Sequence, residues 1–192
     1  MVDLINLKKN IIKIPKNVSI FFCENNFLVI KGNNCVKTIK LKTQIKVFIK
    51  KKILKITPLL LKSYERKKLK VLYNVYISRI KQLVKETFKK QKKKLNMVGV
   101  GYKVFVLTTK LVIPFVILQL KLGYSHFIYI RIPKDFIVVC PKYNKIFIQG
   151  NHQQRINLLA FLIKSYKMPE PYKVKGIFCF NEQIKLKKGK KV

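Results

Sequence analysis

Acidic residues are the scarcest chemical group in this chain of 192 residues. Seven Asp and Glu stand against 43 Lys and Arg, so the formal net charge is +36. Metal-assisted chemistry on nucleic acids needs carboxylates held together, and no two acids here lie within five residues of each other. We therefore predict that the protein is not an enzyme and has no catalytic residues. A basic nucleic-acid-processing enzyme or accessory factor is the alternative.

Motifs for metals and cofactors are also scarce. The four cysteines contain no C-x-x-C pair, and His126 and His152 lie far from any cluster of potential ligands, so no metal site is predicted. Gly99 and Gly101 begin a dinucleotide-binding pattern, but Val104 stands at the position of its third glycine. The sequence predicts no cofactor and no small-molecule substrate.

Long apolar runs are missing as well. The longest, Leu111–Leu120, contains Pro114. It is half as long as the roughly 20 residues that a membrane-spanning helix needs. The sequence therefore predicts no membrane span.

Positive charge is abundant, on a chain with enough apolar side chains to fold. Hydrophobic residues make up 49% of the sequence, which excludes a disordered basic tail, while the charge requires a polyanionic partner. Nucleic acid is the leading candidate and an anionic membrane the second. Because lysines and aromatic rings are spread along the chain instead of being collected on one helix, we predict no membrane binding.

Hydrophobic periodicity predicts an α+β fold built from two tandem copies of a small antiparallel sheet packed with one helix. Helical spacing runs from Leu61 to Lys90, and a second helix follows Asn151, which with Gln154 would form a capping box. The buried stripe predicted for the second helix is Ile156, Leu159, Ala160 and Ile163. The predicted parts are residues 1–92, residues 93–168, and an RNA-binding arm and tail at residues 169–192.

An internal similarity supports this duplication. Ile14–Gly32 and Ile132–Gly150 both open with Ile-Pro-Lys, close with glycine and hold two β-rich runs around a turn. We interpret them as equivalent hairpins, with Pro15 superposed on Pro133. Chance similarity between two hairpins is the alternative.

The segment Pro169–Ile177 is the strongest indication of function. Its prolines fix their own backbone angles and favour extended conformations in the residues before them, which predicts a stiff extended arm. Such an arm presents a ring to a base and cations to phosphates. An ordinary proline turn with incidental lysines is the alternative. The predicted RNA-binding residues are Tyr172, Lys173, Lys175 and Gly176.

Two further features are candidates for RNA contact. His126 follows Ser125, but with so few acids nearby we interpret it as a structural or RNA-contacting histidine and not as a catalytic one. Lysines gather at the end of the first predicted helix, where they are either a solvated helix end or an RNA-facing patch. The patch includes Lys92, Lys93 and Lys94.

The sequence motifs occur along the chain in a characteristic order. They are the long predicted helix, Val-Gly-Val-Gly-Tyr-Lys at 98–103, Leu-Gly-Tyr-Ser-His at 122–126, the Ile-Pro hairpin, Gly150, a second helix, Pro-Glu-Pro-Tyr and a lysine-rich end. In this order they resemble the L-six family of large-subunit ribosomal proteins. The resemblance covers nearly the whole chain and is strongest from Met97 to Lys191. It implies two tandem copies of one α+β fold, binding to large-subunit ribosomal RNA near the sarcin-ricin region, and no catalysis.

The resemblance also implies RNA binding by the arm and by a basic tail, with ribosomal proteins as neighbours and no homo-oligomer. The predicted tail residues are Lys185, Lys187, Lys188, Lys190 and Lys191. The chain departs from the family at Val174, where glycine is usual, at Phe127, where proline is usual, and at His152, where aspartate is common. The hairpin around Leu111–Leu120 is longer than usual and very apolar, so we expect a neighbouring protein to cover it.

The amino-acid composition suggests where in the cell the protein works. Lysine outnumbers arginine 39 to 4 and alanine occurs once, a bias towards residues with AT-rich codons. With no recognisable presequence, we predict a mitochondrial ribosome in the matrix and a gene in the organelle itself. A plastid or the cytoplasm of an AT-rich bacterium is the alternative.

Overall fold

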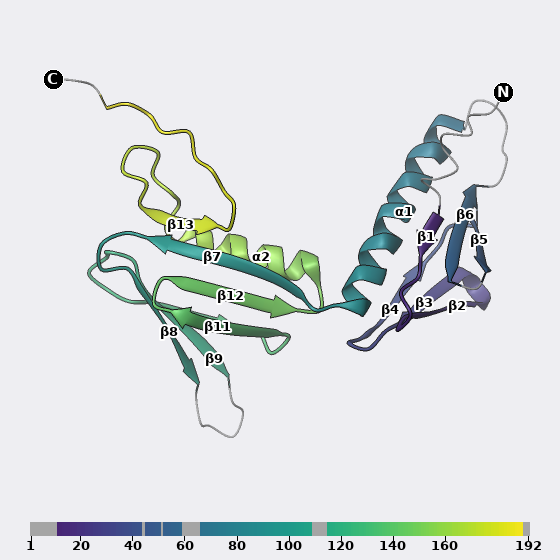
Figure 1. The fold of residues 1–192 in the computed structure, drawn as a ribbon, viewed down its shortest axis with the longest axis horizontal. Coiled ribbons are helices and arrows are strands. Elements are labelled where there is room, and N and C mark those ends of the chain that lie inside the picture. The colour runs from purple at the N-terminus through teal and green to yellow at the C-terminus, as the bar shows by residue number, and fades with distance from the viewer. Residues whose placement is uncertain (1–10, 44, 51, 59–65, 109–114, 190–192) are drawn as a thin grey trace. The chain divides into compact units, whose positions relative to one another are not determined.

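The computed structural model describes residues 11–43, 45–50, 52–58, 66–108 and 115–189. The chain forms two compact units, Met1–Lys90 and Gln91–Val192 (Figure 1). Both combine antiparallel strands with one helix, so the predicted α+β class is confirmed. The division falls just before residue 92, where the first module was predicted to end.

In its described residues, the first unit forms two three-stranded sheets and one long helix. The sheet orders are β1-β6-β5 and β2-β3-β4. The elements are β1 (Ile11–Lys13), β2 (Ser19–Cys23), a short 3-10 turn (Glu24–Asn26), β3 (Phe27–Lys31), β4 (Val36–Lys40), β5 (Ile45–Lys50), β6 (Ile53–Pro58) and α1 (Arg66–Phe88). One sheet was expected in each copy. Alternation identifies the buried face of a strand but not its neighbours, so the division into two sheets follows only from strand pairing.

Helix α1 packs on both sheets through an apolar stripe. Its buried residues follow helical three- and four-residue steps. They are Tyr73, Ile77, Ile80, Leu83 and Val84. The Tyr73 hydroxyl donates a hydrogen bond of 2.9 Å to the carbonyl oxygen of Ile56 in β6, and burial raises the pKa of Tyr73 to about 12. Residues 61–65 of the predicted helix lie outside the described part.

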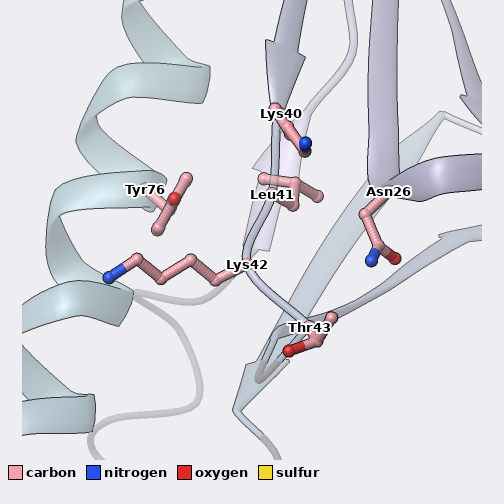
Figure 2. Close-up of a pocket in the computed structure, with 6 residues that line it drawn as sticks. All are labelled: Asn26, Lys40, Leu41, Lys42, Thr43 and Tyr76. Atoms are coloured by element: carbon pink, nitrogen blue, oxygen red, sulfur yellow. The ribbon is translucent and has the colours of Figure 1, made fainter.

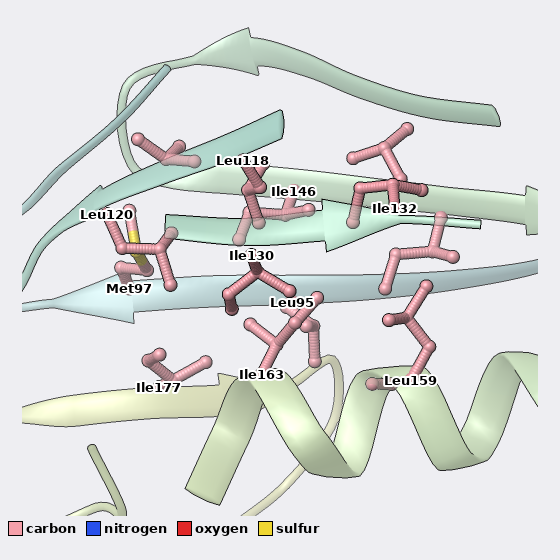
Figure 3. Close-up of a cluster of buried hydrophobic side chains, with 14 of the residues drawn as sticks. Leu95, Met97, Leu118, Leu120, Ile130, Ile132, Ile146, Leu159, Ile163 and Ile177 are labelled. Atoms are coloured by element: carbon pink, nitrogen blue, oxygen red, sulfur yellow. The ribbon is translucent and has the colours of Figure 1, made fainter. Parts of the chain in front are cut away.

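The second unit follows the same plan with one additional strand. Its sheet orders are β10-β9-β8 and β11-β12-β7-β13. The elements are β7 (Gln91–Val98), β8 (Lys103–Thr108), β9 (Val116–Lys121), β10 (Ile128–Ile132), β11 (Phe136–Lys142), β12 (Lys145–Gly150), α2 (Gln153–Ser165) and β13 (Gly176–Cys179). Side chains from both sheets and from α2 meet in one apolar core (Figure 3). This core fixes β7 and β13, which carry the candidate site.

Helix α2 buries the four residues predicted from its sequence, Ile156, Leu159, Ala160 and Ile163. Its N-terminus differs from the prediction, because the N-cap residue is His152 instead of Asn151 and no side chain caps the helix. Arg155, in the first turn, forms an exposed ion pair of 2.8 Å with Asp135. In the described part of the chain, no helix has both the length and the apolar character needed to cross a bilayer.

The two units correspond strand for strand in chain order. Among the described residues six strands precede the helix in each unit. The sheet orders β1-β6-β5 and β2-β3-β4 match β7-β12-β11 and β8-β9-β10. The pairing agrees as well: Ile12 pairs with Leu54 in the first unit, as Leu95 pairs with Ile146 in the second. All four side chains are buried. The tandem duplication of the fold is therefore present.

This correspondence corrects the equivalence inferred between Ile14–Gly32 and Ile132–Gly150. Both segments are antiparallel hairpins, β2–β3 and β11–β12. However, β2–β3 contains the second and third strands of the first unit, whereas β11–β12 contains the fifth and sixth strands of the second unit. The counterpart of β11–β12 is β5–β6, so Pro15 and Pro133 do not occupy equivalent places. The shared residues reflect the requirements of two similar hairpins.

Candidate nucleic-acid interface

The predicted arm is a closed turn and not an extended strip. Residues 171–173 form the turn, and two backbone hydrogen bonds close it. The Glu170 N–H donates to the Lys175 carbonyl oxygen at 2.9 Å, and the Val174 N–H donates to the Glu170 carbonyl oxygen at 3.0 Å. Proline restricts its neighbours but also suits the first central position of a turn. Of the two shapes considered, the proline turn is the correct one.

Gly176 holds this turn against the segment that follows α2. It is buried, with a φ of 146°, and a Cβ at this position would lie 2.6 Å from the Pro169 Cα and 2.8 Å from the Met168 carbonyl oxygen. The close approach that glycine allows is thus made by the protein's own backbone. Next to it, the Ile177 N–H donates to the Lys167 carbonyl oxygen at 3.0 Å.

Val174 has a left-handed backbone conformation, with a φ of 58°. A β-branched residue rarely occupies this region, which costs an L-residue about 1–2 kcal/mol. The resemblance noted in the sequence implies glycine at this position. The positive φ supplies the physical reason, because glycine reaches this conformation without strain.

The turn exposes the ring and the cations that the sequence predicted. Tyr172 is 56% exposed, and Lys173 and Lys175 are also exposed. The tail that follows β13 returns to the turn, since the Lys187 N–H donates to the Pro171 carbonyl oxygen at 3.2 Å. The predicted tail lysines Lys185, Lys187 and Lys188 are exposed, and Lys190 and Lys191 lie outside the described residues.

The lysines of β7 divide between the two faces of the sheet. Lys92 and Lys94 are exposed, whereas Lys93 on the opposite face is half-buried. The Lys94 ammonium lies 5.2 Å from the centre of the Phe147 ring and 5.0 Å from that of the Phe180 ring. Neither ring was predicted from the sequence, because only the pairing of β12 with β7 and the return of the chain after β13 bring them to Lys94.

Glu182 fixes the start of the tail. Its carboxylate accepts hydrogen bonds from the Lys164 ammonium and, at 2.9 Å, from the Cys179 N–H. The bond from Lys164 and then that from Cys179 hold the pKa of Glu182 below its usual range, although partial burial opposes them. One of the few acids in the chain therefore anchors the tail to α2.

His126 belongs to a cluster of rings on the loop between β9 and β10. Its ring stacks on that of Tyr124 with centres 5.8 Å apart, and the Lys167 ammonium lies 4.5 Å over the Tyr124 ring. The Tyr124 hydroxyl donates to the Tyr166 carbonyl oxygen at 3.1 Å. Because Lys167 also binds the backbone of Ile177, this cluster is connected to the turn.

The apolar run Leu111–Leu120 is only partly available to a partner. Its first four residues lie outside the described part. In β9, Leu118 and Leu120 are fully buried in the core of their own unit. These two side chains are therefore not available to a neighbouring protein, and the predicted contact of the hairpin with such a protein stays a prediction.

A hollow of about 450 Å³ lies beside α1 in the first unit (Figure 2). It is lined by Asn26, Lys40, Leu41, Lys42, Thr43 and Tyr76. These residues include neither a carboxylate nor an imidazole, the groups that most often act as general acid or base. Among the described residues no three potential metal ligands gather. This hollow therefore offers no carboxylate or imidazole for general acid–base chemistry.

Comparison with known proteins identifies the family. A family model described as Ribosomal protein L6 matches residues 98–178. The chain is 35% identical over 182 residues to large ribosomal subunit protein uL6 of Mycoplasmoides gallisepticum, covering 94% of this chain and 93% of that protein. The uL6 proteins of Afipia carboxidovorans (32% over 168 residues; 88% and 89% covered) and Alkaliphilus metalliredigens (30% over 179 residues; 93% and 94% covered) are also similar. The chain belongs to the ribosomal protein L6 family, as the order of its sequence marks indicated.

Family membership also decides the class of activity. Ribosomal protein L6 is a structural, non-enzymatic component of the ribosome. The prediction that the chain is not an enzyme is therefore confirmed, and the alternative of a nucleic-acid-processing enzyme is wrong. These three relatives are bacterial, so the chain is of the bacterial type, and a mitochondrial source stays a prediction.

Proposed function

We propose that this structural constituent of the large ribosomal subunit binds ribosomal RNA near the sarcin-ricin region through its second unit. The proposed contacts are the turn at 169–175, the described tail at 180–189, the outer face of β7 and the rings around His126. The proposal rests chiefly on the exposed Tyr172, Lys173 and Lys175, which project from a turn closed by backbone hydrogen bonds.

The chemistry of these contacts is that of backbone recognition with stacking. Lysine ammonium groups bind phosphates as point charges, and an aromatic ring such as Tyr172 stacks on an unpaired base. Because the turn is already ordered, little conformational entropy is lost when it docks. The mechanism is architectural: phosphates are neutralised, and the rigid turn fixes the orientation of the protein on the RNA.

The proposal is tested with the full chain carrying Tyr172→Ala, Lys173→Ala and Lys175→Ala. Loss of two phosphate contacts should reduce the slope of log affinity against log salt by about 1.5, at about 0.7–0.9 per phosphate. Loss of a stacked ring should weaken binding by about 1–3 kcal/mol more. The measurement is a salt titration with an RNA fragment that contains the sarcin-ricin stem-loop, with an unrelated stem-loop for comparison.

A matched control lies in the turn between β11 and β12, where Lys142, Tyr143 and Lys145 are also exposed. Replacing these three by alanine also removes one tyrosine ring and two lysine charges, but at the opposite edge of the sheet β11-β12-β7-β13 from β13. This variant should bind nearly as well as the parent chain. Equal losses from the two variants would show that only total charge matters, and the assignment to the turn would be withdrawn.

The proposal also covers a protein neighbour and the location. A neighbouring ribosomal protein would contact the outward side of the β8–β9 hairpin, where Leu107 is 42% exposed.

The mitochondrial ribosome is proposed as the location from the AT-rich composition, and the bacterial cytoplasm is compatible with the bacterial relatives. Cosedimentation of the tagged chain with large subunits from isolated organelles tests this location. Recovery only outside organelles would reject it.

A further inference from the structure

The first unit has a basic sheet surface that the proposed function does not use. It lies on the outer side of the sheet β1-β6-β5, where side chains alternate with those of the buried core. Strand pairing sets Phe48 beside Lys55, and Ile53 between Lys50 and Lys13. We define the basic face as Lys13, Lys46, Phe48, Lys50, Ile53 and Lys55.

Every residue of the basic face is exposed. Phe48 is 50% and Ile53 44% exposed, and the four lysines are exposed as well. Phe48, Lys50, Ile53 and Lys55 also border a hollow of about 440 Å³. A flat group can therefore lie against the Phe48 ring with ammonium groups within reach.

The charges of this face have no counterpart within the described chain. The strands β1, β5 and β6 contain no acidic residue, and none of the four lysines forms an ion pair in the part that the structure describes. Cations gathered in this way repel one another and destabilise the fold until an anion binds. The arrangement therefore calls for a polyanion.

A general excess of lysine does not explain this pattern. The outer side of the other sheet, β2-β3-β4, also exposes a phenylalanine, Phe21, at 54%. Its cross-strand partner is Val29, which in turn pairs with Thr38. The second exposed ring on that side, Phe27, pairs with Lys40, whose ammonium lies 5.6 Å from the ring centre and covers it. Within the described residues no ammonium covers the Phe48 ring in this way, although Lys55 is its cross-strand partner and Lys46 and Lys50 stand two residues away on either side, about 7 Å along β5.

We propose that the basic face binds an unpaired segment of RNA, with one base stacked on Phe48 and the adjacent phosphates on Lys46, Lys50 and Lys55. Single-stranded nucleic acid is bound in this way, by rings for the bases and cations for the backbone. A duplex keeps its base faces stacked inside the helix, and so offers nothing to Phe48. This contact is additional to those of the second unit and lies outside the residues 98–178 that the family model matches.

Ultraviolet cross-linking of the unsubstituted full chain to a single-stranded oligouridylate is the first test. A stacked base and ring are in contact, so the cross-linked peptides found by mass spectrometry should include the one containing Phe48. A self-complementary RNA duplex of equal length should not cross-link there. Absence of the Phe48 peptide, or equal cross-linking to the duplex, overturns the proposal. Because the chain is unsubstituted, a folding defect cannot cause either result.

Binding measurements give the second test. One variant carries Phe48→Leu, Lys50→Gln and Lys55→Gln, and its matched control carries Phe21→Leu, Lys31→Gln and Lys40→Gln. Both are made in a chain that also carries the Tyr172, Lys173 and Lys175 alanine substitutions, so that a failure of the second-unit site is measured separately.

The basic-face variant should lower the salt slope for oligouridylate by about 1.4, at about 0.7 per phosphate on a single strand. It should also weaken binding about fivefold or more through the lost ring, while the control variant binds like its parent. Equal losses in both variants overturn the proposal. So does competition by vesicles of anionic phospholipid at least as strong as that by RNA, because the face would then be a membrane contact.

Discussion

Replacing Gly176 by alanine tests whether the proposed RNA-binding turn is rigid. The added Cβ would lie 2.6 Å from the Pro169 Cα and 2.8 Å from the Met168 carbonyl oxygen, and these backbone atoms cannot rotate away. The φ of 146° is also unfavourable for an L-residue. We expect about 1–3 kcal/mol for the backbone conformation and about 1–3 kcal/mol for the overlap. The free energy of unfolding should therefore fall by about 2–6 kcal/mol.

Two other glycines separate these contributions. Gly101 has a φ of 73°, but a Cβ added there would meet nothing within 4 Å, so Gly101→Ala should show only the conformational penalty of about 1–2 kcal/mol. Gly189 has neither a positive φ nor a neighbour within 4 Å, so Gly189→Ala should change nothing. Urea unfolding of the full chain in high salt, followed by circular dichroism, gives the order of stabilities. Hydrogen exchange at the Ile177 amide shows whether the loss lies in β13.

The order of the three variants in stability shows whether the turn is rigid. If Gly176→Ala is no more destabilising than Gly101→Ala, the Pro169 backbone moves aside easily. The turn would then not be preorganised, and the entropic argument for its RNA binding would fail.

Two further substitutions probe the same region. Val174→Gly should raise the free energy of unfolding by up to about 1 kcal/mol. The reason is that the relief of left-handed strain (about 1–2 kcal/mol) exceeds the entropic cost of glycine (about 0.5–1 kcal/mol). A lower free energy of unfolding in the same urea titration would mean that the contacts of the valine outweigh the strain. Glu182→Gln should destabilise the chain by about 1 kcal/mol at neutral pH. Because the folded pKa of Glu182 lies below its ordinary value of 4.5, the carboxylate stabilises the fold above pH 4.5 and this contribution is lost as the pH falls further. The gap between parent and variant should thus close below about pH 4.5, and a gap independent of pH would argue against the ion pair with Lys164.

Features with a strong local period were predicted well. The stripe of α2 is correct in all four residues because helical spacing and burial refer to the same face of one element. The exposure of Tyr172, Lys173 and Lys175 also agrees with the sequence, since lysines and a proline-directed turn are typical of the surface. Their proposed contact with RNA stays a prediction.

Features that depend on distant pairing were predicted poorly. The hairpins β2–β3 and β11–β12 resemble each other locally, but their places differ because sheet order is set by strands far away in sequence. Likewise, the two rings beside Lys94 come from β12 and from the chain after β13. The close fit of Gly176 to Pro169 arises only when the turn closes.

Composition and the order of motifs were thus sufficient to assign the class of the protein: a basic, folded, non-catalytic member of the ribosomal protein L6 family with two α+β units. They suffice because charge, periodicity and motif order are properties of the chain itself. Tertiary structure alone decided that the proline segment is a turn, that Glu182 anchors the tail, and that lysines from three strands form one face around Phe48. The physical reason is that each of these depends on hydrogen bonds or contacts between residues brought together only by folding.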